Sequence, residues 1–282
     1  MKETRITEQP STHGNLEALS TRELLEGINE EDRKVAEAVH ACLPQIERLV
    51  DALVPRMQQG GRLFYLGAGT SGRLGVLDAS EIPPTFGMPA DRVIGLIAGG
   101  DTALRHPVEH AEDDRHQGWK DLQAQHIGAL DTLVGIAASG TTPYVIGALE
   151  EARRHGILTA AITSNPQSPL SQTADIAIEV NVGPEFVTGS SRMKSGTAQK
   201  MILNMLSTST MIRLGRVKGN RMVHMQLSNQ KLVERGVRML MDELQLPEAE
   251  AQRLLLEQGS VQHVLETYPN ALNCLTNTNQ PP

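Results

Sequence analysis

Residues 63–75 read LFYLGAGTSGRLG, a short apolar run that leads directly into a loop of glycines and hydroxyl residues. The glycines allow backbone amides to approach an anion at the start of a helix. Thr70 and Ser71 add hydroxyl donors immediately after Gly69. This sequence of strand, glycine-rich turn and helix start predicts a phosphate-binding loop.

A second loop of similar composition follows the apolar run that ends at Ala138. It reads SGTTPY and contributes Ser139, Gly140, Thr141 and Thr142. Hydroxyl residues that cap a helix would explain either loop alone. Because two such loops occur, each with glycine beside the hydroxyl groups, we favour a shared phosphate site.

The spacing of apolar runs around these loops predicts the fold. Five runs have the length of strands and are separated by stretches long enough for crossover segments. They are Leu63–Leu66, Val93–Ala98, Thr132–Ala138, Leu158–Thr163 and Ile176–Val180. This alternation predicts an α/β protein with a doubly wound parallel five-stranded sheet. Ligands bind at the carboxyl edge of such sheets, so we expect the loops after the first and third strands to meet there.

Helices are expected before this sheet. Ser20 and Glu23 form a capping-box pattern that opens a short helix. From Asn29 onward apolar residues recur at helical spacing, which predicts one long helix that bends near Pro44.

Further helices are expected after the sheet. The stretch beyond Gly183 carries an apolar stripe rich in methionine, which is typical of a core or a subunit interface. The end of the chain predicts three short helices, broken near Pro247 and Gly259, and a disordered tail from Asn273. We therefore divide the chain into an N-terminal helical segment, a main domain and a small helical C-terminal domain with its tail, at residues 1–59, 60–227 and 228–282.

Composition excludes several classes of function. A net charge of -7 and an aromatic content of 2% argue against a nucleic-acid partner, which would require a basic face. The polar N-terminus has no signal-peptide pattern and no run is long enough to span a membrane, so we expect a cytoplasmic protein. Cys42 and Cys274 lack the spacing of a disulfide framework or zinc site, and we expect both to be buried.

A dinucleotide site is the main alternative for the first loop, because its glycines also satisfy the pattern GxGxxG. That pattern alone is a weak signal, and it requires an acidic residue at the end of the second strand to bind a ribose. Here the second strand leads into AGGD, which places Asp101 too far along the chain. The Thr-Ser pair in the loop also suits one terminal phosphate better than a pyrophosphate.

The paired loops are the pattern of sugar isomerase domains, and nearly the whole chain resembles the N-acetylmuramic acid 6-phosphate etherases among them. The resemblance rests on long segments: ITEQPSTHGNLEALST, YLGAGTSGRLGVLDASEIPPTFG, AEDD, SGTTPY and TGSSRMKSGTAQKMILNMLSTSTMIRLG. Motifs of this length are far more specific than GxGxxG.

The resemblance implies roles for individual residues. It implies phosphate contacts from Thr70, Ser71, Ser139 and Thr142. It implies a catalytic pair, Glu81 in DASE and Glu112 in AEDD, which without the resemblance would look like ordinary surface acids. Ser191 and Arg192 match a segment that lies beside the bound sugar phosphate in the related glucokinase regulatory protein. The chain departs from its relatives at Ile82, where many have Cys, and at Ala137, where many sugar isomerase domains have a phosphate-binding serine.

The family reaction removes D-lactate from carbon three of the sugar and leaves N-acetylglucosamine 6-phosphate. It proceeds by elimination followed by water addition, so one carboxyl must be ionised while another is protonated. We assign Glu81 as the acid and Glu112 as the base. An unbroken helix would place Glu81 about 13 Å along the axis from Gly72. Either the substrate spans that gap or a second subunit supplies the residue, so we expect a homodimer with sites near its interface.

Two other functions use the same loops. An aldose-ketose isomerase acting on a phosphosugar would abstract a similar proton without releasing lactate. A regulatory protein would bind a phosphosugar without turnover, but the two family acids are present here. Histidines near AEDD, such as His110, are better explained by a solvated helix face than by a metal site. The resemblance implies a phosphosugar as partner and no metal or cofactor.

Overall fold

The computed structural model describes residues 5–268, which form two compact units. The first unit takes the described residues up to Ser80 together with Asp91–Thr210. The second takes Glu81–Ala90 together with the described residues from Met211 onward. Within residues 5–268, no helix is long and apolar enough to cross a membrane.

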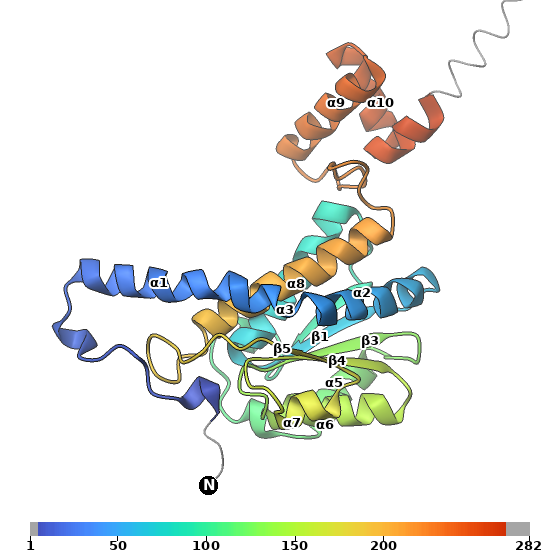
Figure 1. Cartoon of the computed structure of the whole chain (residues 1–282). Coiled ribbons are helices and arrows are strands. Elements are labelled where there is room, and N and C mark those ends of the chain that lie inside the picture. Colours follow the sequence, from blue (N-terminus) through green and yellow to red (C-terminus); the bar gives the residue numbers. More distant parts are fainter. Residues whose placement is uncertain (1–4, 269–282) are drawn as a thin grey trace, which may run out of the picture. The chain divides into compact units, whose positions relative to one another are not determined.

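A five-stranded parallel sheet forms the centre of the first unit (Figure 1). Its strands are β1 (Leu63–Gly67), β2 (Val93–Ile97), β3 (Thr132–Ile136), β4 (Leu158–Thr163) and β5 (Ile176–Glu179). Their order across the sheet is β2-β1-β3-β4-β5. The predicted fold class is confirmed, and each strand ends within two residues of its predicted limit because apolar runs set these elements locally.

Helices cover both faces of the sheet. One face carries α5 (Gln117–Ala124), α6 (Pro143–Arg154) and α7 (Pro169–Thr173). On that face Phe64 and Leu66 of β1 pack in one core cluster with Tyr144 and Leu149 of α6. Every residue of β1 and β3 is buried, as expected for central strands of a sheet covered on both sides.

The opposite face carries α2 (Leu43–Gln58), α3 (Gly69–Phe86) and α8 (Lys194–Arg213). A side chain at Gly75 of α3 would collide with Tyr65 of β1, so this glycine lets the helix lie close to the sheet. Helix α8 buries the face formed by Ala198, Ile202 and Leu206, whereas Met201 and Met205 are half-buried. Of the predicted methionine-rich stripe, Met211 is buried in the core and Ile212 is exposed.

The N-terminal region differs from the sequence prediction. A single helix, α1 (Thr21–His40), begins at the capping box of Ser20 and Glu23 and runs through Asn29 without interruption. The chain then leaves the helix and starts α2, with Pro44 in its first turn. The predicted bent helix is thus two helices, because proline fits the first turn of a helix but disrupts its interior.

Short elements complete the first unit. They are η1 (Ile6–Glu8), η2 (Leu16–Ala18), α4 (Thr102–Arg105) and η3 (Ala111–Asp113). Cys42 is buried, as predicted, whereas Cys274 and the tail from Asn273 lie outside the described residues.

The second unit contains α9 (Gln230–Leu244), α10 (Glu248–Gln258) and a further helical stretch at 261–268. The breaks near Pro247 and Gly259 are where the sequence predicted them. The units do not follow the expected boundaries at residues 60 and 228. Helix α2 packs on β5 within the first unit, and Arg56 of α2 donates to the carbonyl of Ala129 at 2.8 Å, which joins the N-terminal helices to the sheet.

Candidate active site

A pocket of about 520 Å³ lies at the carboxyl edge of the sheet, where the loops after β1 and β3 meet. Because β1 and β3 are neighbours while their crossovers diverge, this edge is the topological switch point at which doubly wound sheets bind ligands. The predicted site residues that line the pocket are Gly69, Thr70, Ser71, Glu112, Ser139, Thr141, Thr142 and Ser191.

The first loop turns tightly because Gly67 and Gly72 approach each other. A side chain at Gly72 would come within 2.8 Å of the carbonyl oxygen of Gly67. The turn directs the start of α3 at the pocket, and Ser71 there is buried and donates to Oε1 of Gln199 at 2.9 Å. The Thr70 hydroxyl makes no hydrogen bond within residues 5–268, so it is free to bind a ligand.

Hydrogen bonds and close packing hold the backbone of the second loop in place. Gly140 has φ +67, and a side chain on it would overlap Ser168. Asn165, which follows β4, donates to the carbonyls of Ala138 at 3.0 Å and Ser139 at 3.2 Å. These hydrogen bonds to backbone carbonyls stabilise the conformation of the loop and do not involve its hydroxyl groups.

The hydroxyl groups of the second loop are available to a ligand. Thr142 occupies the N-cap position of α6, yet its side chain makes no capping hydrogen bond. Capping therefore does not explain Thr142, which is one of the residues that line the pocket. Ser139 accepts from the backbone amide and hydroxyl of Thr141, both at 3.2 Å, which leaves its own proton to be donated.

Arg5 lines the same pocket although the sequence analysis did not select it. Its Nη1 donates to Oγ1 of Thr141 at 2.7 Å, across 136 residues of chain. Gln199 was missed in the same way. Its Nε2 is buried without a hydrogen-bond partner in the described part of the chain. Gln199 lies in one of the segments on which the resemblance rests, whereas Arg5 directly precedes another, and neither residue had a local signal of its own.

Glu112 reaches the pocket from η3, where it is exposed to solvent. Ser191 reaches it from the segment before α8. Gly140 and Arg192 are not among the residues that line the pocket, and Arg192 is exposed. Gly140 serves the site through the backbone turn that it permits.

Glu81 belongs to the second unit and is described separately. It lies on α3, which is unbroken from Gly69 to Phe86 in spite of Pro83 and Pro84. The Glu81 side chain is exposed and makes no hydrogen bond or ion pair within the described residues. The helix is therefore unbroken between Gly72 and Glu81, as the estimate of about 13 Å along its axis assumed.

A buried carboxylate, Asp78, lies in the middle of α3. Asp78 accepts hydrogen bonds from Nδ2 of Asn204 at 2.8 Å and from the hydroxyls of Tyr65 at 3.1 Å and Ser207 at 3.2 Å. Burial raises the pKa of Asp78, while these hydrogen bonds oppose the rise. Burial also raises the pKa of Tyr65, and the neighbouring Asp78 adds to that effect. These hydrogen bonds join β1, α3 and α8.

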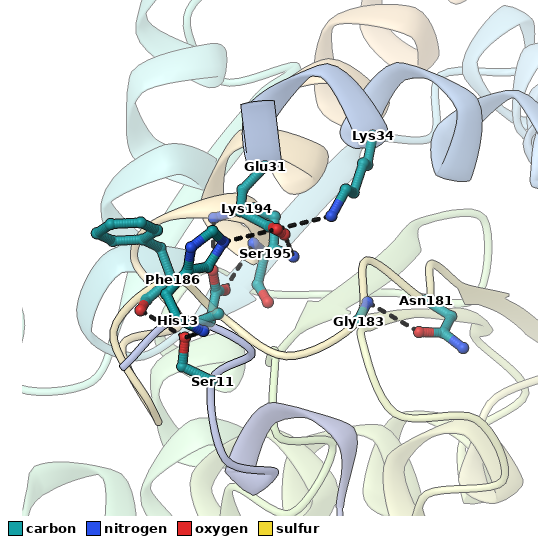
Figure 2. Close-up of polar contacts among 10 residues, drawn as sticks. Ser11, His13, Glu31, Lys34, Asn181, Gly183, Phe186, Lys194 and Ser195 are labelled. Atoms are coloured by element: carbon teal, nitrogen blue, oxygen red, sulfur yellow. Dashed lines mark hydrogen bonds and ion pairs between the residues drawn. The ribbon is translucent and has the colours of Figure 1, made fainter. Parts of the chain in front are cut away.

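A second polar network fixes the segment that leads to Ser191, and Figure 2 shows it. Buried Lys194 forms an ion pair with buried Glu31 of α1 at 2.5 Å, and Glu31 also contacts Lys34 at 2.6 Å and His13 at 3.1 Å. Burial opposes ionisation of Glu31, but hydrogen bonds from Lys194, Lys34 and His13 overcome it and lower the pKa of Glu31 to about 2. The start of α8 is thereby tied to α1.

The sequence matches two families of sugar isomerase (SIS) domains. Residues 45–153 match the family described as glucokinase regulatory protein N-terminal SIS domain, and residues 107–209 match the family described as SIS domain. Together the two matches span the sheet and the loops after β1 and β3.

Similar proteins were found by sequence and by structure. The N-acetylmuramic acid 6-phosphate etherase of Porphyromonas gingivalis strain W83 is 70% identical over 263 residues, which cover 93% of this chain and 96% of that protein. The N-acetylmuramic acid 6-phosphate etherase of Bacteroides thetaiotaomicron is 66% identical over 264 residues, which cover 94% and 95%. A phosphoheptose isomerase from Francisella tularensis has a similar fold, with a TM-score of 0.53, 20% identity and coverage of 68% of this chain and 98% of that one.

Proposed function

The chain belongs to the family of N-acetylmuramic acid 6-phosphate etherases, and we propose that it binds its substrate between the loops after β1 and β3. As a member of this family it is an enzyme, a carbon–oxygen lyase. It cleaves the D-lactyl ether of N-acetylmuramic acid 6-phosphate to N-acetylglucosamine 6-phosphate and D-lactate. This reaction belongs to the recycling or catabolism of cell-wall amino sugars.

One observation supports the proposed location of the substrate site. The free hydroxyl groups of Thr70 and Thr142 and the carboxylate of Glu112 all line a single pocket. Its volume of about 520 Å³ is in the range of small-molecule sites. The two loops and the helix starts behind them supply amides and hydroxyls to the phosphate, while Glu112 supplies a proton acceptor at the same pocket.

In the proposed mechanism the open-chain aldehyde acidifies the proton on carbon two. Glu112 as carboxylate takes that proton, and Glu81 as carboxylic acid protonates the ether oxygen on carbon three as D-lactate leaves. Water then adds to carbon three of the unsaturated aldehyde, and a proton returns to carbon two. The oxygen of the ether stays with lactate, and the new hydroxyl oxygen comes from water.

We propose that two copies of the chain form the working enzyme. Glu112 lines the pocket and Glu81 does not, so a substrate that reaches both acids must either extend beyond the pocket or meet Glu81 from a second subunit. Leu77, one turn before Glu81 on α3, is 51% exposed. If a second copy supplies Glu81, the part of α3 that carries Leu77 would lie at the interface between the two copies. We place the enzyme in the cytoplasm, where phosphorylated sugars are retained.

The decisive assay mixes the purified protein with N-acetylmuramic acid 6-phosphate and measures D-lactate. In heavy-oxygen water the label is expected in the sugar and not in lactate. Substitution at the lactate carbon would instead label lactate, and an aldose-ketose isomerase would release none.

The roles of Glu81 and Glu112 can be distinguished by measuring hydrogen exchange at carbon two in heavy water. Glu81→Ala is expected to retain exchange of the proton on carbon two while losing lactate release, because the base is intact. Glu112→Ala is expected to lose both. Exchange that survives in Glu112→Ala and disappears in Glu81→Ala would reverse the two roles.

A further inference from the structure

We propose that Arg5 is the cationic residue that binds the substrate phosphate, and that residues 5–13 form an N-terminal strap that holds it at the pocket. The inference rests on the proposed function for the choice of ligand, a phosphosugar. It adds a binding residue from a part of the chain that lies outside both sugar isomerase matches.

The charge of the pocket requires such a residue. Arg5 has the only basic side chain among the described residues that line the pocket, whereas Glu112 and Asp113 are acidic. A phosphate monoester carries a charge of about −1.5 to −2 near neutral pH, so it would enter a pocket that is otherwise neutral or negative. A guanidinium at the pocket offsets that charge.

The position of Arg5 suits the loops already assigned to phosphate. Its Nη1 donates to Oγ1 of Thr141 at 2.7 Å, in the loop that also carries Ser139 and Thr142. Its remaining guanidinium donors make no hydrogen bond within residues 5–268. A guanidinium can donate two parallel hydrogen bonds to one phosphate, so these free donors match the ligand in geometry as well as in charge.

The strap is anchored beside Arg5 by a buried contact. Thr7 is buried, and its hydroxyl accepts from Nδ2 of Asn165 at 2.9 Å while its backbone amide donates to Oδ1 of Asn165 at 3.3 Å. The same Asn165 amide braces the carbonyls of the second loop. Arg5 and the loop that it contacts are thus positioned by one side chain.

The other end of the strap is anchored to the segment before α8 (Figure 2). Ser11 donates its hydroxyl to the carbonyl of Phe186 at 2.8 Å and its amide to Oγ1 of Thr188 at 2.9 Å. His13 packs against the Phe186 ring and contacts buried Glu31 at 3.1 Å. With both ends fixed, the strap places Arg5 at the pocket before any ligand binds, which lowers the entropy lost on binding.

The test measures binding of N-acetylglucosamine 6-phosphate and of inorganic phosphate by calorimetry, with N-acetylglucosamine as the neutral comparison. Arg5→Gln is expected to weaken binding of both phosphates by about 10- to 100-fold, as for loss of a hydrogen bond to a charged group. Arg5→Lys should lie between, because it keeps the charge and loses the paired geometry. Arg22→Gln, at an exposed position of α1, is the matched control and should bind as the unaltered protein does.

The strap is tested by Thr7→Val, which keeps the shape of the side chain and removes the acceptor for Asn165. It should weaken phosphate binding in the unaltered background and have no further effect in Arg5→Gln, because the two changes act through one residue. Thermal unfolding establishes that each variant is folded.

The inference is overturned if Arg5→Gln binds both phosphates within twofold of the unaltered protein, or if the unaltered protein binds neither. Equal losses from Thr7→Val in both backgrounds would overturn the role of the strap. Failure of the unaltered protein to release D-lactate would contradict the proposed reaction instead, since the binding series does not depend on turnover.

Discussion

The Ser71 hydroxyl donates a hydrogen bond to Oε1 of Gln199, which lies 128 residues later in the chain and 2.9 Å away. Both side chains are buried, and Nε2 of Gln199 has no partner in the described part of the chain. The loop after β1 is therefore supported from α8 by a residue with unused donors. This relationship makes Gln199 a positioning residue for Ser71.

Replacing Gln199 should raise the KM for the phosphosugar more than it changes kcat. Gln199→Leu removes the acceptor for Ser71 and should raise KM by about 3- to 10-fold, the effect of one neutral hydrogen bond. Gln199→Glu keeps an acceptor but adds a negative charge beside the phosphate loop, so its KM should rise further. Initial rates of D-lactate release measure both values. A Glu variant with an unchanged KM would contradict this role.

The turn at Gly140 should not tolerate a side chain. Gly140→Ala combines a left-handed backbone at φ +67 with overlap on Ser168, and should lower the free energy of unfolding by about 2 to 4 kcal/mol. Gly156→Ala is the matched control, because Gly156 has φ +71 and open space around it. It should cost about 1 to 2 kcal/mol from the backbone alone. Urea unfolding measures both, and equal losses would show that overlap with Ser168 has no effect.

The free energy of unfolding should depend on pH in the acidic range because of Glu31. Its pKa is lowered to about 2 from 4.5, so the ionised form stabilises the fold above about pH 4.5. That contribution, about 3 kcal/mol, is lost as the pH falls through about 2.

The measurement is urea unfolding at several pH values between 6 and 2. The free energy of unfolding of Glu31→Gln should fall less over this range than that of the unaltered protein. Glu30→Gln, at the exposed neighbouring position, should follow the unaltered protein. Parallel curves for all three proteins would rule out a contribution from Glu31.

A charged residue in place of Leu77, which is exposed on α3, should disrupt the proposed dimer. Leu77→Asp is expected to shift the protein to monomers in light scattering and to lower D-lactate release by at least about tenfold, because a buried charge at an interface is strongly unfavourable. Leu130→Asp is the control. Leu130 is 45% exposed and directly precedes β3, at the amino edge of the sheet rather than on α3. A Leu77→Asp monomer with full activity would exclude sites shared between subunits.

Local signals were sufficient for the sheet and for the two loops. The apolar run at Leu63 and the glycines that follow it form a strand and a turn because backbone conformation and burial depend on nearby residues. The same reasoning failed at Pro44, where one bent helix was predicted and two helices form. Spacing of apolar residues continues across a helix break, so periodicity alone did not reveal it.

The parallel sheet, the pair of hydroxyl-rich loops at its carboxyl edge and the relation to the family could all be predicted from short runs of residues. The side chains that surround those loops could not, because they come from distant parts of the chain. Arg5, Asn165 and Gln199 reach them across more than a hundred residues or between separate elements, and no local pattern encodes such contacts. Their positions follow from the packing of the strap and α8 against the sheet, and packing is a property of the folded chain as a whole.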